Sequence, residues 1–401
     1  MIDVDAASAA APAPLPPEPR VLEIRFTGSG SEYFRIWAVN LLLILVTVGL
    51  YLPFAKARRI RYFYANTLVD GQALSFHGDP WKMFRGFVLL VVLMGAYSGA
   101  GRVSATAALV AFIILCAVWP ALWRASMQFR LGNTSWRGLR MRFEGSLKDA
   151  YLACAPLYLP TIVFVAWSRL MMPHVTGDAA ADRAAVAAYA SFSLFAMGTL
   201  ALLSPLSFAL FKRYQHNGYR IAGQQARIDL GIGRVYLLGL KTLGVAIGSA
   251  LLAMLVFGLL GFGLMAATGL QADRTSPLAQ AGFLVIVLLA YLLVFSIVMP
   301  YGAARMQNLA WSRTRSEALA FRSELRFFAL AGLTMKNWLL TALTLGLYRP
   351  FAAVATARLR LEAVQIESRE DPADWVAAGL AGHADATGDI AGDFFGIDMG
   401  L

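Results

Sequence analysis

The sequence contains little charge for its length. Asp, Glu, Lys and Arg make up 15% of its 401 residues, whereas 58% are hydrophobic. In an average soluble protein roughly a quarter of the residues are charged. The mean hydropathy of +0.60 is also far above that of a soluble domain. This composition predicts a membrane protein.

Cysteine and histidine are scarce, and their positions argue against a metal site. Cys116 and Cys154 lie in or beside apolar runs without Cys-x-x-Cys spacing, so neither a disulfide framework nor a zinc site is expected. The four histidines fall in separate loops at positions 77, 174, 216 and 383. We therefore expect no metal ion and no cofactor.

Signatures of nucleotide binding and hydrolysis are absent from the sequence. It has no Walker-type phosphate loop, no His-Glu-x-x-His and no Gly-x-Ser-x-Gly nucleophile motif. No set of nucleophile, base and metal ligands can be assembled, so we name no catalytic residue and favour a non-enzymatic protein.

The apolar runs have no Asp or Glu in their interiors. Ion-coupled carriers and proton pumps usually keep such a carboxylate within the membrane to bind a cation or a proton. Its absence counts against a coupled transporter. A facilitator or channel remains compatible, because Asn, Thr, Tyr and backbone carbonyls can line its path.

The apolar runs predict an all-α membrane protein, since backbone amides in lipid must be satisfied within each segment. We expect a polytopic bundle of about eight apolar segments, with residues 1–22 as a disordered leader, 23–362 as the transmembrane domain and 363–401 as an acidic tail. The segments are residues 34–54, 87–97, 105–122, 151–170, 184–210, 236–265, 281–300 and 327–351.

An internal repeat joins the first and last segments. Residues 47–55 and 344–352 are identical at seven of nine positions. In both copies an Asn precedes the Thr by seven residues and an Arg follows the Pro by eight. We therefore predict a membrane protein built of pseudo-repeats, in which the end units hold one apolar segment each and the three middle units hold two.

The charge distribution predicts which loops face the cytoplasm. Residues 55–82, 123–148, 211–241 and 305–326 together hold 22 basic and 6 acidic residues, while the turns between them are nearly neutral. Lys and Arg accumulate in cytoplasmic loops. Three helical hairpins should therefore point away from the cytoplasm.

The membrane path of the repeated segments has two interpretations. We favour a single crossing by each, which places both chain ends outside. The alternative is that each dips into the membrane and returns, which places both ends in the cytoplasm and agrees better with the basic residues Arg358 and Arg360.

Short extended segments are expected on the cytoplasmic side. Before each helix an aromatic or apolar residue is followed by Gly, at Phe26–Gly28, Phe76–Gly78 and Phe143–Gly145, and more weakly at Ile228–Gly231. Alternation of polar and apolar residues at 140–143 and 226–229 is typical of strands.

These motifs carry a resemblance to a known family. Phe26-Thr27-Gly28, the stretch from Asn40 through 47–55, and residues 61–67 together resemble the YjgN-like family of bacterial inner-membrane proteins, whose domain has no known function. The resemblance implies a multi-pass protein of the bacterial inner membrane. It implies no catalytic or binding residues.

Two sets of residues are candidate sites. Asn40, Thr47, Asn337 and Thr344 could line a polar pathway for an unknown solute, although Asn and Thr also commonly bond between helices. Arg58, Arg59 and Arg61 could contact anionic lipid head groups. Topology alone also explains a basic cytoplasmic face, and we expect no nucleic-acid partner. The main hypothesis is a transporter, facilitator or membrane-organising protein; the alternative is a lipid-interacting or lipid-modifying protein.

The C-terminal region differs from the rest in charge. From residue 363 it holds eight acidic residues and one Arg. We expect that it could fold back on the basic face if both lie on the same side.

Overall fold

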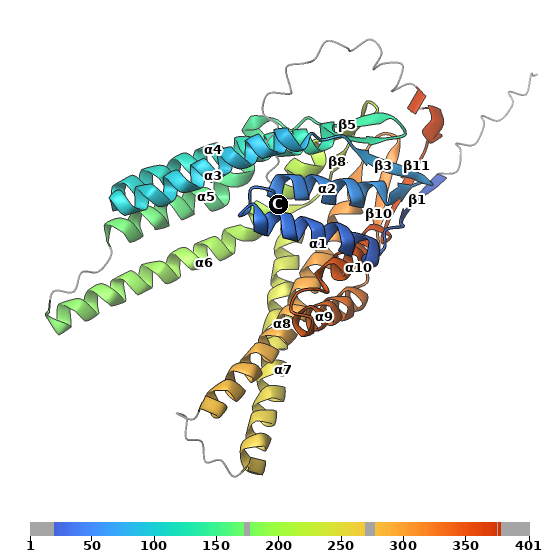
Figure 1. Cartoon of the computed structure of the whole chain (residues 1–401). Helices are drawn as coiled ribbons and strands as arrows, with labels where there is room; N and C mark the ends of the chain where they lie inside the picture. Colours follow the sequence, from blue (N-terminus) through green and yellow to red (C-terminus); the bar gives the residue numbers. More distant parts are fainter. Residues whose placement is uncertain (1–19, 172–176, 269–276, 375, 378–401) are drawn as a thin grey trace, which may run out of the picture.

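The computed structural model describes residues 20–171, 177–268, 277–374 and 376–377, most of them helical (Figure 1). Six of the described helices, α3 to α8, are long and apolar enough to cross a membrane. Figure 1 shows α1, α2, α9 and α10 gathered beside the strands, whereas the other six extend well beyond them. The helices are α1 (Gly30–Val46), α2 (Leu52–Ala65), α3 (Pro80–Val103), α4 (Ala105–Gly132), α5 (Leu147–Leu170), α6 (Ala179–Asn217), α7 (Ile232–Thr268), α8 (Pro277–Trp311), α9 (Phe327–Leu343) and α10 (Arg349–Leu361).

The extended segments form one 11-stranded antiparallel sheet in the order β7-β6-β5-β4-β3-β2-β1-β11-β10-β9-β8. Its two end strands, β7 and β8, are separated only by Ala226, whose N–H donates to the Tyr219 carbonyl at 2.8 Å. The strand order therefore begins and ends on neighbouring residues, so the described strands close into a ring. The strands are β1 (Arg20–Phe26), β2 (Thr67–Val69), β3 (Gln72–Phe76), β4 (Thr134–Trp136), β5 (Leu139–Phe143), β6 (Tyr219–Ile221), β7 (Gln224–Gln225), β8 (Arg227–Ile228), β9 (Thr314–Arg315), β10 (Leu319–Ser323) and β11 (Val364–Ser368).

Five times around this ring, a strand leads into two helices and the chain returns to a strand that pairs with the first. We call these segments unit 1 (20–69), unit 2 (72–136), unit 3 (139–221), unit 4 (224–315) and unit 5 (319–368). In each unit the same backbone bond follows the first strand, with N···O distances of 2.8 to 3.1 Å. The five bonds run from Thr27 to Asn66, His77 to Asn133, Glu144 to Gly218, Asp229 to Arg313 and Glu324 to Ala363.

The strand pairing contradicts our preference for single crossing by the repeated segments. Phe26, before α1, pairs with Thr67, after α2, and Ser323, before α9, pairs with Val364, after α10. Each chain segment therefore returns to the ring from which it started. With 17 residues each, α1 and α9 are about 26 Å long, shorter than the roughly 30 Å hydrocarbon layer. This return agrees with the re-entrant alternative.

A tight turn reverses the chain at both hairpin tips. The Thr47 hydroxyl donates to the Leu43 carbonyl at 2.7 Å and accepts from the Tyr51 N–H at 3.0 Å. Thr344 makes the same two bonds in unit 5. The next two residues have positive φ in both copies, 49° and 89° at Val48 and Gly49. The Thr-x-Gly of the repeat thus encodes a helix-terminating turn.

The prediction of a helical membrane protein is confirmed, and strands occur at the four predicted extended sites, where they join into a sheet that was not expected. Three of the strand connections have two central residues with positive φ, as in the two-residue hairpins that match strand twist. They are Asp70-Gly71, Arg137-Gly138 and Ala222-Gly223. The ring extends from Arg20 to Ser368, beyond both expected ends of the membrane domain at 23 and 362.

The Phe-x-Gly motifs turn each strand into the following helix. A Cβ at Gly28 would lie 2.8 Å from the Phe26 ring, and Gly78 and Gly145 lie under Phe76 and Phe143 in the same way. The residue after each glycine, Ser29, Asp79 or Ser146, caps the helix by accepting from a backbone N–H. Glycine is required because the aromatic ring occupies the place of a side chain.

This topology predicts that the ring and the tip of the α3–α4 hairpin lie on opposite sides of the membrane. In a chain with Cys116 and Cys154 replaced by Ala, we expect an impermeant thiol reagent to label Val103→Cys in intact cells. Val21→Cys, on β1, should react only after the membrane is permeabilised. Both positions are exposed, at 80% and 49%. Labelling of Val21→Cys in intact cells would show that unit 1 crosses the membrane.

Candidate functional site

A polar contact at the base of each returning helix links the five units. In each case a side chain of one unit donates to a backbone carbonyl of the loop that begins the next helix pair, and unit 5 closes the circle onto unit 1. We call these contacts the clamps. They are Arg61 to Gly78 (3.0 Å), Arg124 to Gly145 (2.7 Å), Arg213 to Leu230 (2.8 Å), Asn308 to Leu325 (3.0 Å) and Arg358 to Gly28 (2.9 Å).

The clamps give a structural role to an arginine proposed as a lipid contact. Arg61 is one of the five donors, and Arg358 is its counterpart in the repeat. Arg58 and Arg59 are exposed on α2, with their guanidinium groups 5.6 Å from the Tyr51 ring centre and 5.9 Å from that of Phe63. The structure thus leaves Arg58 and Arg59 more available than Arg61 to an external anion.

The proposed polar pathway residues lie in the two re-entrant hairpins. Asn40 and Asn337 are buried, at 6% and 7% exposure, and the side-chain carbonyl oxygen of each lacks a hydrogen-bond partner. The Asn337 amide donates to Thr356 at 3.2 Å. Thr47 and Thr344 use their hydroxyls in the turns at the tips. The hairpins lie side by side, with Phe34 of α1 packed on Phe351 of α10 at 5.7 Å. The role of these four residues in a pathway stays a prediction.

The ring and the ends of the returning helices enclose a cavity of about 620 Å³, lined by residues from all five units. Alternate strand residues point into it, including Leu22 and Ile24 of β1 and Leu319 and Phe321 of β10. Helices α2, α4, α8 and α10 contribute side chains from their last turns. Small-molecule sites typically occupy about 300 to 1,000 Å³ and are mostly apolar, and this cavity meets both criteria.

Cations without acidic partners distinguish this cavity from an ordinary core. The lining holds Arg130, Arg220 and Arg360 and no Asp or Glu. Arg220 is neutralised from outside, because it donates to both carboxylate oxygens of Glu144 at 2.7 Å. Among the described residues, no ion pair joins Arg130 or Arg360 to a carboxylate. Arg130 is partly buried and Arg360 is exposed, and their positive charge would attract an anionic ligand into the cavity.

Neighbouring groups orient these two cations. The Arg360 guanidinium donates to the Gln307 side chain at 2.9 Å, and the Gln307 amide donates back to the Arg360 carbonyl at 2.9 Å. Burial lowers the pKa of Arg360, although much of the residue remains exposed. Burial also raises the pKa of the Tyr219 hydroxyl, and the nearby charge of Arg130 opposes that shift.

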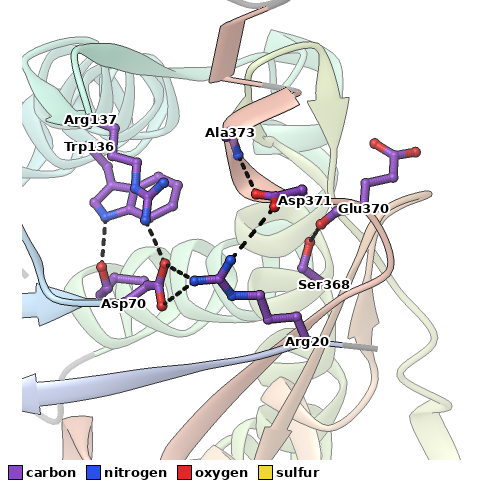
Figure 2. A network of polar contacts seen from close by, with 9 residues as sticks. Arg20, Asp70, Trp136, Arg137, Ser368, Glu370, Asp371 and Ala373 are labelled. Carbon is purple, nitrogen blue, oxygen red and sulfur yellow. Dashed lines mark hydrogen bonds and ion pairs between the residues drawn. The ribbon is translucent and has the colours of Figure 1, made fainter. Parts of the chain in front are cut away.

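An apolar cluster closes the end of the ring away from the helices. Leu22, Val69, Trp136 and Leu319 pack there with Val376, from the first part of the acidic tail. A polar network surrounds this end (Figure 2): Asp70 accepts from both Arg20 and Arg137, and Arg20 lies 3.8 Å from Asp371. The start of the tail therefore lies on the ring, as expected for a tail on the same side; residues 378–401 fall outside the described part.

Comparison with known sequences identifies the family of the chain. The model of a family described as bacterial proteins of unknown function, DUF898, matches residues 21–394. The chain belongs to this family. It is 27% identical to inner membrane protein YjgN of Salmonella typhimurium over 143 residues, and 30% identical to that of Escherichia coli O157:H7 over 143 residues.

These matches cover 35% of the chain and 36% and 35% of the two relatives, so the chain matches about a third of their length. No solved structure matches. The predicted resemblance is confirmed, and with it a multi-pass protein of the inner membrane.

Sequence reasoning missed the cavity residues. Arg130 and Arg360 each follow the proline of their returning helix by ten residues, Pro120 and Pro350. Aligning the five units on that proline would have placed both arginines at equivalent positions. The closing of the strands into a ring, which turns those positions inward, has no comparable sequence signal.

Loss of a clamp should destabilise the fold more than loss of an arginine on the same helix that makes no such bond, although both Arg61 and Arg58 are exposed. Arg61→Ala removes a charged donor to a backbone carbonyl, an interaction worth about 1.5–3 kcal/mol. Arg58→Ala removes only a surface cation–π contact of about 0.5–1 kcal/mol. We expect Arg358→Ala, which loses bonds to both Phe26 and Gly28, to lower the thermal unfolding midpoint at least as much as Arg61→Ala. Equal midpoints for Arg61→Ala and Arg58→Ala would contradict the clamp role.

Proposed function

We propose that the protein is a non-enzymatic membrane transporter or facilitator that takes an anionic solute into the ring cavity. The observation that carries this proposal is the pair Arg130 and Arg360, two cations without carboxylate partners in a largely apolar cavity. The cavity lies where the returning helices leave the membrane. A ligand there would sit between the membrane and the basic face.

The five units are, on this proposal, pseudo-repeats of one ancestral hairpin. Each returning helix contains one proline of the set Pro53, Pro120, Pro205, Pro300 and Pro350. In each unit the residue fourteen positions after that proline pairs with the strand that precedes the two helices. The sequence predicts about eight apolar segments, and on this proposal six of them span the membrane and two re-enter it. Asn40 and Asn337, with Thr47 and Thr344 at the tips, are our proposed polar route along the two short hairpins.

A lipid-interacting or lipid-modifying role is the second candidate. It is favoured by the exposed pair Arg58 and Arg59 on α2, which follow an apolar tip whose Val48 is 92% exposed. Basic residues near a membrane surface attract anionic head groups at about 1 kcal/mol each. Arg61 would add to this field while holding its clamp.

The proposal predicts that the cavity attracts anions from water. In the chain without native cysteines, Ala357→Cys places a thiol on the lining, one turn before Arg360. At each position we measure the ratio of two modification rates, that of a negatively charged methanethiosulfonate reagent over that of a positively charged one. We expect this ratio to be about tenfold higher at Ala357→Cys than at Gln72→Cys on the exposed surface. Arg130→Gln with Arg360→Gln should abolish the preference. Equal relative rates at the two sites would overturn the proposal.

A further inference from the structure

We infer that the ring cavity binds a single-chain anionic amphiphile, with its carboxylate or phosphate head group between Arg130 and Arg360 and its hydrocarbon chain along the apolar wall of the ring. This inference rests on the proposed function, because it assigns a ligand class to the same cavity. The experiment below distinguishes a soluble anion from a lipid-derived one as the ligand.

The head-group end is defined by charge. Arg130 lies close enough to Tyr219 for its charge to affect the tyrosine hydroxyl, and Arg360 is fixed by its paired bonds with Gln307. A guanidinium group presents several donors in one plane, which suits carboxylate and phosphate oxygens. Arg130 comes from unit 2 and Arg360 from unit 5, so these two cations approach the cavity from different units.

The remaining lining is too apolar for a small hydrated anion alone. Ile24, Leu74, Met141, Phe321 and Ile366 all face the space, and they come from β1, β3, β5, β10 and β11. If inorganic phosphate bound at the arginines, these apolar side chains would remain in contact with water. A hydrocarbon chain would cover it, and each methylene removed from water contributes to binding.

The direction of entry favours a ligand from the membrane. The end of the ring away from the helices is filled by Trp136, Val69 and Val376, with Leu22, Leu139 and Leu319. At the other end, α4 and α8 run directly from the apolar layer into the lining. Units 1 and 5 lie next to each other in the ring and hold only re-entrant hairpins. Among the described residues, only these short hairpins cover that side of the ring, so we expect lipid to approach them.

Tryptophan quenching can test the inference, because Trp136 and Trp311 line the cavity. The full chain is placed in nanodiscs of neutral phosphatidylcholine and titrated with omega-bromododecanoic acid, whose bromine quenches nearby indoles. We expect saturable quenching, most of which disappears in a chain carrying Trp136→Phe and Trp311→Phe. The dissociation constant should rise about tenfold or more in Arg130→Gln with Arg360→Gln.

Two matched variants control this measurement. Arg227→Gln with Arg315→Gln removes two exposed arginines that face each other across β8 and β9 outside the cavity, and it should leave the dissociation constant unchanged. Arg130→Lys with Arg360→Lys keeps both charges and should retain most of the binding. If the glutamine variant unfolds, the lysine variant and the tryptophan variant still decide the result.

Two other outcomes separate this inference from the proposed function. Quenching that does not saturate, together with anion-preferring labelling of Ala357→Cys that inorganic phosphate slows, would overturn the amphiphile and leave a site for a soluble anion. Unsaturable quenching with no anion preference in the labelling would overturn both. Saturable quenching that does not change in the glutamine variant would also overturn the inference, because the arginines would not hold the head group.

Discussion

Antiparallel pairing of the two strands that flank each helix pair is the constraint from which the rest of the structure follows. A chain that leaves the ring at Phe26 must return beside it at Thr67, whatever the length of helix between. The same holds for Phe143 and Tyr219 across the much longer α5 and α6. Helix length is therefore free to vary, and the ring remains the same.

The clamps extend this constraint from within units to between them. Strand pairing alone leaves each helix pair free to tilt about its strands. A guanidinium group or an amide on each returning helix, bonded to the next loop, fixes one unit against its neighbour. Unit 2 shows that the contact is kept although the position changes, because Arg124 lies one turn earlier than Arg61 relative to its proline and still reaches the loop carbonyl. The contact between Arg358 and Gly28 closes the circle between the two ends of the chain.

Ring closure also explains the cavity and its charge. Side chains alternate across a strand, so a closed ring has an inner set of residues that must fill or line its centre. Here the inner residues do not fill it, and about 620 Å³ remains open. Arg130 and Arg360 face this space without carboxylates, whereas the acidic residues Asp70 and Asp371 lie outside it, paired with Arg20. The arrangement separates the two signs of charge and leaves the cavity positive.

The sequence by itself determined the membrane class, the family, the three long hairpins and the sites of the extended segments. These follow from local properties: apolar length, basic loops, and Phe-x-Gly and Thr-x-Gly motifs whose geometry involves neighbouring residues. Only the tertiary structure decided that the chain returns to the ring after 34–54 and 327–351, because a 17-residue apolar helix suits either path until its flanking strands are paired. Only it brought Arg130 and Arg360 to one cavity, since their approach depends on hydrogen bonds between strands more than two hundred residues apart in the chain.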